Sequence, residues 1–346
     1  MADKRTTAIA ITIIATSLII TVLTISGNLT LSPNTAKRSL VVFCAGSLYI
    51  PLENFKNVYE ELNPDVEVIL EPSGSLEAVR KVTDLGRRCD VLALADYRLI
   101  SLYLIDNYTS WGVAFASNRL VLCYTNNSKY SDQINAENWY EILSMPDVKY
   151  GFSDPNKDPC GYRSLMAIGL ASLQYEKNIL KNLVLDRSNI KAIEEDETLH
   201  IYVPANLEID VATLEVRSKS VNLIALLETG ALDYAFEYRS VAIQHNLKYI
   251  ELSPEINLGD PKHDNFYAKV KVYILHNTDK EKIIEGASIT YGVTIPSTAE
   301  NSEDAIKFIQ LLVSDTGRSI FESLGQPFLE NPIYVGDVPV ELRSKE

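Results

Sequence analysis

The chain has 346 residues, 46% of them hydrophobic and 23% charged, and its formal net charge is −14. This length exceeds the usual size of a single hydrophobic core, so two lobes are expected. The surplus negative charge repels nucleic acid, which excludes a nucleic-acid-binding role. An anionic ligand must then be held by nearby N–H and hydroxyl dipoles that point at it, because the negative charge of the whole protein repels an anion.

The N-terminus predicts a segment that enters or crosses a membrane. Lys4 and Arg5 precede an apolar run over residues 8–25, and as a helix this run would be roughly 27 Å long, close to the thickness of a bilayer core. The basic flank stays inside, so the rest of the chain is expected to be extracytoplasmic. Because the run is longer than a typical signal-peptide core, a retained anchor is favoured over a cleaved signal. Residues 1–38 then form the anchor or signal and its tether.

From residue 39 onward, apolar strand-like runs alternate with amphipathic stripes. Residues 39–44, 66–70 and 90–95 predict strands, and residues 51–62 and 76–86 predict the helices between them. Three strands joined by crossover helices indicate a parallel α/β sheet.

The same alternation begins again after Trp111. Further strands are predicted at 119–125, 148–154, 199–205, 232–238, 248–253 and 287–296, with helices at 161–180, 221–230 and 302–325. Residues 265–275 alternate between apolar and polar side chains, which predicts an edge strand.

The four cysteines, Cys44, Cys89, Cys123 and Cys160, are not spaced as a zinc site. Three of them lie in or beside apolar strand-like runs, so buried thiols are favoured. Disulfides remain the alternative for an exported chain.

Small hydroxyl and glycine residues gather where predicted strands meet helices. Gly46 and Ser47 follow the first strand, and Ser75 follows the second. Such junctions aim backbone N–H groups at one point, at the carboxyl ends of parallel strands where open sheets bind ligands. The purely structural alternative is an N-cap and a tight turn.

The second half holds comparable positions. The turn Asp154-Pro155-Asn156 follows a strand, Ser220 lies at a predicted helix start, and Tyr238 ends a strand. Each taken alone has a structural explanation. Serine-hydrolase, nucleotide-binding and zinc-protease motifs are missing from the sequence, so a binding protein without a cofactor is favoured over an enzyme.

Several segments together resemble the archaeal tungstate/molybdate-binding proteins of ABC transporters. They are LVVFCAGSLYIPLENF, PSGS, DVLALADYRLI, SDPNKDPCGYR, LDYAFEYRSVA and YGVTIP followed by LGQPF, and they span about residues 39–332. The resemblance implies a class II periplasmic-binding-protein fold, with two α/β lobes joined by two hinge crossings. The first lobe would comprise residues 39–117 and 292–346, and the second residues 118–291.

The resemblance also implies the ligand and the partners. Tungstate or molybdate would be bound by a monomer held at the membrane by its N-terminal segment, and delivered to an ABC permease with its ATPase. The oxyanion site of the family maps onto Gly46, Ser47, Ser75, Asp154, Pro155, Asn156 and Tyr238.

One position departs from the family pattern. Members that bind the metal octahedrally carry a glutamate where this chain has Ser220, so a second carboxylate ligand is expected to be absent unless Glu215 or Glu237 replaces it. Ser220 is expected to donate a hydrogen bond to the oxyanion instead. A carboxylate beside a buried dianion is unfavourable, so Asp154 either bonds to the metal centre, acting as a Lewis acid, or turns its side chain away.

Other readings remain open at this point. The same fold could bind sulfate, phosphate or ferric iron, and the 19 tyrosines leave iron open. A secreted α/β enzyme and a sensory or adhesive ectodomain are further alternatives.

Overall fold

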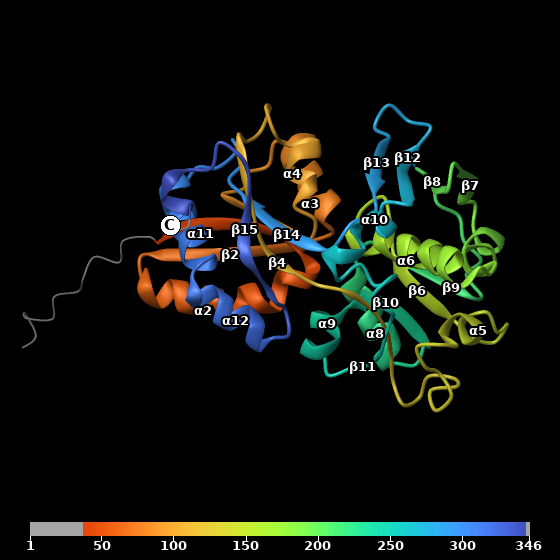
Figure 1. The fold of residues 1–346 in the computed structure, drawn as a ribbon. Helices are drawn as coiled ribbons and strands as arrows, with labels where there is room; N and C mark the ends of the chain where they lie inside the picture. The colour runs from red at the N-terminus through yellow and green to blue at the C-terminus, as the bar shows by residue number, and fades with distance from the viewer. Residues whose placement is uncertain (1–36, 344–346) are drawn as a thin grey trace, which may run out of the picture. The chain divides into compact units, whose positions relative to one another are not determined.

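A computed structural model describes residues 37–343, in which the first and last strands share one sheet (Figure 1). Its six strands run in the order β15-β4-β14-β3-β1-β2. Their bounds are β1 Arg38–Ala45, β2 Val66–Ser73, β3 Val91–Leu94, β4 Trp111–Ser117, β14 Thr290–Thr294 and β15 Phe328–Gly336. Strands β1 and β3 are parallel, whereas β14 pairs antiparallel with β3 and β4. The sheet predicted as parallel is therefore mixed.

Helices cover both faces of this sheet, with α3 and α4 on one side and α2 and α12 on the other (Figure 1). Their bounds are α2 Tyr49–Leu62, α3 Ser75–Thr83, α4 Arg98–Tyr103, α11 Ser302–Leu312 and α12 Asp315–Ser323. Burial on both faces explains why β1 and β3 are apolar along nearly their whole length.

The middle of the chain forms two further sheets. A five-stranded sheet has the order β11-β5-β10-β6-β9, and a four-stranded sheet has the order β13-β12-β8-β7. Their strands are β5 Leu120–Tyr124, β6 Tyr150–Ser153, β7 Lys191–Glu195, β8 Thr198–Pro204, β9 Leu214–Arg217, β10 Tyr234–Tyr238, β11 Lys248–Glu251, β12 Val270–His276 and β13 Lys282–Glu285. The remaining α-helices are α5 Trp139–Leu143, α6 Pro159–Tyr175, α7 Ile179–Leu183, α8 Ile224–Glu228, α9 Arg239–Gln244 and α10 Asp264–Tyr267.

The prediction of an edge strand at residues 265–275 is wrong. Strand β12 lies inside its sheet, antiparallel to β13 on one side and parallel to β8 on the other. Its alternating pattern arises because one face packs on α6 while the other is partly exposed, and that pattern does not depend on whether a strand has one neighbour or two.

Helix α6 is buried over its whole first part, from Pro159 to Ala171. It packs against β6 and β10 of one sheet and β12 of the other, so it needs apolar residues on nearly all sides. Gly161 is required at its start, since a Cβ there would lie 2.0 Å from Ser153 O. This close approach holds the N-terminus of α6 against the end of β6.

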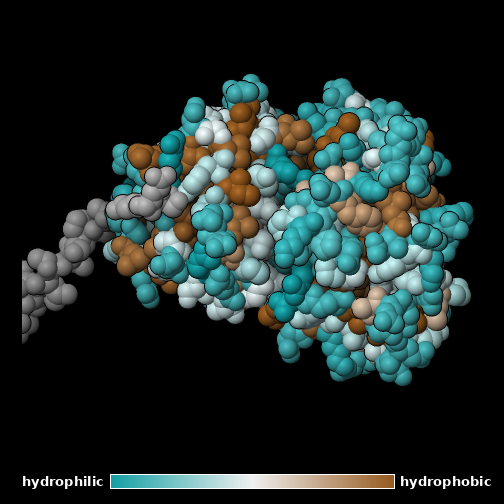
Figure 2. Space-filling model, viewed as in Figure 1, coloured by the Kyte–Doolittle hydropathy of each residue, from teal (hydrophilic) through white to brown (hydrophobic). Residues whose placement is uncertain are grey.

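The surface of the described residues is mainly hydrophilic on the face drawn in Figure 2, with scattered hydrophobic side chains. Within residues 37–343, no helix combines the length and the apolar character needed to cross a bilayer. The predicted membrane segment at residues 8–25 lies outside the described residues.

All four cysteines are buried and free. Burial raises the pKa of Cys44 and of Cys89 to about 12, and it raises those of Cys123 and Cys160 as well. The thiolate is the reactive form, so these thiols should be inert in the folded protein.

We therefore expect Ellman's reagent to label essentially no cysteine in the native protein. Four thiols should react after denaturation without a reductant, because each is a free thiol in the core. Two or no reactive thiols in denaturant would show that disulfides form instead.

Candidate functional site

Three of the predicted hydroxyl groups lie buried at strand ends. Ser47 belongs to the short helix η1 (Gly46–Leu48) after β1, Ser75 is the first residue of α3 after β2, and Tyr238 is the last residue of β10. These residues are 4%, 0% and 1% exposed. We call Ser47, Ser75 and Tyr238 the hydroxyl cluster.

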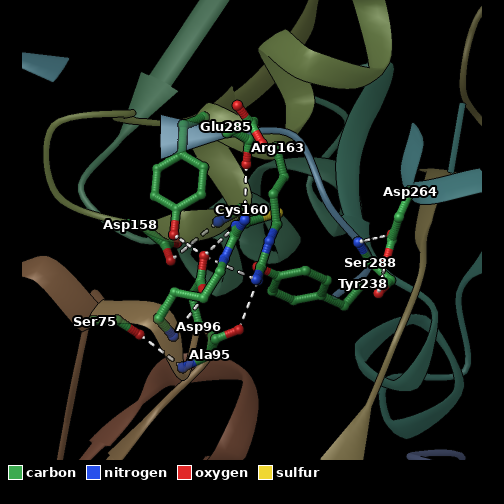
Figure 3. A network of polar contacts seen from close by, with 12 residues as sticks. Ser75, Ala95, Asp96, Asp158, Cys160, Arg163, Tyr238, Asp264, Glu285 and Ser288 are labelled. Atoms are coloured by element: carbon green, nitrogen blue, oxygen red, sulfur yellow. Dashed lines mark hydrogen bonds and ion pairs between the residues drawn. The ribbon is translucent and has the colours of Figure 1, made fainter. Parts of the chain in front are cut away.

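Arg163 connects two members of the hydroxyl cluster (Figure 3). Its Nη1 donates to the Tyr238 hydroxyl at 2.8 Å and to the carbonyl oxygen of Ala95, after β3, at 2.6 Å. The N–H of Ala95 in turn donates to Ser75 Oγ at 2.9 Å. A side chain of α6 thus ties the end of β10 to the ends of β2 and β3.

Tyr291 of β14 contacts Ser47, the third member of the hydroxyl cluster. Its hydroxyl donates to Ser47 Oγ at 3.2 Å and accepts from Asn118 Nδ2 at 3.1 Å. The rings of Tyr291 and Tyr238 meet edge to face at 5.8 Å. Ser47, Ser75 and Tyr238, which come from segments far apart in the sequence, are therefore linked through one set of buried contacts.

Arg163 is one of two guanidinium groups that surround the buried carboxylate of Asp96. Asp96 Oδ2 accepts from Arg98 at 2.9 Å and from Tyr162 at 2.8 Å, and it lies 3.3 Å from Arg163 Nη2. Burial alone would raise the pKa of Asp96, but the two guanidinium groups outweigh it and hold that pKa well below its usual range. Arg98, Arg163 and Asp96 together carry one net positive charge, and the buried carboxyl group of Asp158 also interacts with Arg163.

Sequence reasoning missed this ion network. Asp96 lies two residues after the buried strand β3, and Arg163 is a cation within an otherwise largely apolar stretch of helix. A charged residue in a buried segment signals a partner elsewhere in the fold, but the sequence does not say which one. Arg163 Nε and Nη2 make no hydrogen bond in the described structure. Buried donors are normally satisfied, so this guanidinium has capacity for an anion.

The turn at residues 154–156 does not present its side chains to the hydroxyl cluster. Asp154 Oδ1 accepts from Asn156 N at 2.9 Å, and Asp154 Oδ2 pairs with Lys157 Nζ at 3.0 Å. Asn156 is 3% exposed and fixes the turn. Its Nδ2 donates to Pro204 O in β8 and its Oδ1 accepts from Leu275 N in β12, so both ends of the amide are held by these strands. Pro155, between Asp154 and Asn156, is buried.

The same turn closes on helix α3. Lys157 O accepts from the N–H groups of Leu76 and Glu77 at 3.1 and 3.3 Å. Gly74 permits this approach, since a Cβ there would lie 2.4 Å from that oxygen. In this conformation the first N–H groups of α3 therefore face a protein carbonyl.

Ser220 begins the short helix η3 (Ser220–Leu223) and is 2% exposed. Ser220 is expected to donate to the oxyanion from its hydroxyl or from an N–H at the helix start, and its N–H instead donates to Asp158 Oδ2 at 2.8 Å. Of the two carboxylates considered as substitutes for the missing glutamate, Glu215 pairs with Lys149 at 2.7 Å and Arg217 at 3.1 Å.

Glu237 is the other candidate, and it is fully buried. Its Oε2 accepts from Tyr238 N at 2.8 Å, while Oε1 makes no hydrogen bond. Burial raises the pKa of Glu237 to about 8, and the nearby Ser220 hydroxyl and Tyr238 N–H only partly offset this. Near neutral pH the carboxyl is therefore mostly protonated and can donate.

Gly46 lies at a cavity of about 370 Å³ beside the hydroxyl cluster. Pro72, Lys219 and Val221 are among its lining residues, and Lys219 Nζ donates to Pro72 O at 3.4 Å. A Cβ on Gly46 would lie 3.1 Å from Val221. Within residues 37–343, no group of three or more His, Cys, Asp or Glu side chains is arranged to hold a metal ion.

The raised pKa of Glu237 predicts a pH-dependent stability. The folded protein retains a proton on Glu237 that the unfolded chain loses above its ordinary pKa of about 4.5. The stability linked to this group is thus fully present below about pH 4.5 and is lost as pH rises through about 8. Between these limits Glu237→Gln should flatten the decline of Tm with pH. An unchanged Tm–pH curve for Glu237→Gln relative to the native chain would contradict the assignment.

The family of this chain follows from its similarity to known proteins. Residues 40–325 match the family described as bacterial extracellular solute-binding protein. An uncharacterised solute-binding protein of Staphylothermus marinus is 52% identical over 315 residues, covering 90% of this chain and 89% of that protein. The molybdate/tungstate-binding protein WtpA of Thermococcus kodakarensis is 45% identical over 320 residues, covering 90% and 88%.

A solved structure supports the fold. The periplasmic molybdate-binding protein of Azotobacter vinelandii superposes with a TM-score of 0.56 at 12% identity, covering 84% of this chain and 100% of that one. At that identity the likeness concerns the α/β fold with mixed sheets alone. The resemblance seen in the sequence motifs is confirmed, and the chain belongs to the family of bacterial extracellular solute-binding proteins.

Proposed function

We propose that this protein is the extracytoplasmic receptor that binds tungstate or molybdate for an ABC importer. The observation that carries the proposal is the hydroxyl cluster, in which Ser47, Ser75 and Tyr238 are buried at strand ends and joined through Arg163 and Tyr291. Such a donor set suits a tetrahedral dianion, which accepts hydrogen bonds only. The relative named as a molybdate/tungstate-binding protein supports the same ligand.

The local charge supports anion binding despite the overall charge of −14. The group of Asp96, Arg98 and Arg163 carries one net positive charge beside the hydroxyl cluster, and Asp96 and Arg163 are buried. A charge acts more strongly in such a water-poor site than at the surface. Lys219 lines the adjacent cavity, so a further cation stands where an anion would enter.

Two lobes are proposed to close around the ligand, one of residues 39–117 and 292–346 and the other of residues 118–291. This division agrees with the sheets, because the six-stranded sheet uses only strands from the first group apart from part of β14. Asn118 and Tyr291, which are hydrogen-bonded, would lie at the two hinge crossings. The N-terminal segment would hold the receptor at the membrane, where a permease and its ATPase take up the ligand. Neither catalysis nor a cofactor is part of this proposal.

Binding should be measured by calorimetry on the purified protein with tungstate, molybdate, sulfate and phosphate. Tungstate and molybdate should bind most tightly, and ligand at about 100 times Kd should stabilise the fold by roughly 2.7 kcal/mol. Tyr238→Phe removes one donor and should weaken tungstate binding roughly tenfold. Tyr59→Phe is the matched control, because its hydroxyl bonds to Asp304 O in the packing of α2. Absence of binding to all four anions would refute the proposed function.

The expected number of oxygen neighbours of the tungsten atom follows from the states of Asp154 and Glu237. Asp154 is engaged by Lys157 and Asn156, and Glu237 is mostly protonated near neutral pH. A protonated carboxyl is a poor metal ligand, so we expect the bound tungstate to keep four oxygen neighbours. X-ray absorption on the tungstate complex tests this. Six oxygen neighbours that fall to five in Glu237→Gln would show that Glu237 replaces the family glutamate.

A further inference from the structure

Strands β12 and β13 form a hairpin, residues 270–285, that projects from the proposed second lobe (Figure 1). We call this hairpin the arm. The base of the arm is held within that lobe, because Gly286 N donates to Val270 O at 2.9 Å. Two residues later, Ser288 N donates to Asp264 Oδ1 at 2.7 Å (Figure 3). The arm is therefore fixed at its base, and its other contacts depend on what lies beside it.

Lysine side chains of the arm reach helices of the proposed first lobe. At the turn of the hairpin, Lys280 Nζ pairs with Oδ2 of Asp84, the residue that follows α3, at 2.7 Å. Lys282, the first residue of β13, places its Nζ 5.6 Å from the centre of the Tyr103 ring at the end of α4. Both contacts join residues that lie far apart in the sequence and on opposite sides of the proposed lobe boundary.

Arg98 joins the base of the arm to the buried carboxylate of Asp96. Its Nη1 donates to the carbonyl oxygen of Glu285, the last residue of β13, at 2.8 Å. Its Nε and Nη2 donate to Asp96 at 3.1 and 2.9 Å. A guanidinium holds its donors in one plane, so the position of the arm and that of the Asp96 carboxylate are linked.

The arm does not pack closely on α4 between these contacts. A cavity of about 430 Å³ lies there, and Leu99, Leu102, Ile283 and Ile284 are among its lining residues. Leu102 and Ile283 remain 36% and 51% exposed. The arm can therefore separate from α4 without opening a close-packed core, as a contact that forms and breaks in each binding cycle requires.

We propose that the arm holds the two lobes together in the ligand-bound conformation, so that the Lys280–Asp84 pair raises the affinity for an anion that it never touches. This inference rests on the proposed function. A contact made in the closed but not in the open conformation lowers the Kd, because closure then costs less free energy. An exposed ion pair changes such an equilibrium by roughly 1.5-fold to fivefold.

Charge reversal tests the pair by calorimetry with tungstate at low ionic strength. Asp84→Lys places like charges together, so the Kd should rise about threefold to tenfold, and Lys280→Asp alone should have a similar effect. The double variant, Asp84→Lys with Lys280→Asp, should return the Kd to within about twofold of the native value. Salt screens exposed charges, so sodium chloride at about 1 M should bring all these Kd values together.

Asp186→Lys is the matched control. Asp186 pairs with Lys181 at 2.6 Å on the surface of the second lobe, with side chains 52% and 58% exposed, and its reversal should leave the Kd unchanged. The Tm of ligand-free Asp84→Lys should equal that of the native chain, since the open conformation lacks the contact.

Several outcomes would overturn the proposal. They are an unchanged Kd in Asp84→Lys, a double variant that does not recover, and a lowered ligand-free Tm with a native Kd, which would mean that the pair only stabilises the fold. Tungstate binding that is insensitive to the reversal refutes the role of the arm and leaves the proposed function intact. A native chain that binds none of tungstate, molybdate, sulfate and phosphate refutes the proposed function, and this inference with it.

Discussion

A buried guanidinium is the interaction on which the candidate site depends. Arg163 is fully buried in α6, yet it donates to the end of β10 and to the end of β3, which belong to different sheets. An unpaired buried charge would be very costly, so the fold must supply Asp96 beside it. Once this pair is in place, the hydrogen bonds of Arg163 also hold Ala95 and Tyr238. Ala95 in turn donates to the hydroxyl of Ser75 and holds it in position. Helix α6 thereby positions donors on two sheets at once.

The proposed site offers a way for an acidic protein to hold a dianion. Overall charge acts at long range and is screened by salt, whereas a buried cation a few ångströms away is not. The buried guanidinium of Arg163 would therefore act on a bound anion more strongly than distant surface carboxylates do. Protonation of Glu237 removes a further negative charge that would otherwise oppose the ligand. These local features are the aimed dipoles and charges that the composition requires.

The hydrogen bonds around Ser47 link the proposed recognition of the ligand to the proposed hinges. Asn118 lies between β4 and β5, and Tyr291 lies in β14, where the other crossing is proposed. A change of hinge conformation would alter the Asn118–Tyr291 contact, and with it the donor that Ser47 accepts. The same side chains would thus contact the ligand site and the proposed hinges. Ligand binding and closure of the lobes would then be coupled.

The sequence by itself determined the alternation of strands and helices, the positions of the junctions that carry Ser47, Ser75 and Tyr238, and the resemblance to its family. These depend on local periodicity and on motifs that survive as strings of residues. It did not determine that β14 and β15 join the first sheet antiparallel, or that β12 is an interior strand, since strand neighbours are set by contacts distant in sequence. Only the tertiary structure brought Arg163 to Asp96, turned Asp154 toward Lys157 and placed Glu237 in a dry environment. Side-chain partners and burial are properties of packing between segments, and no single segment of the chain encodes them.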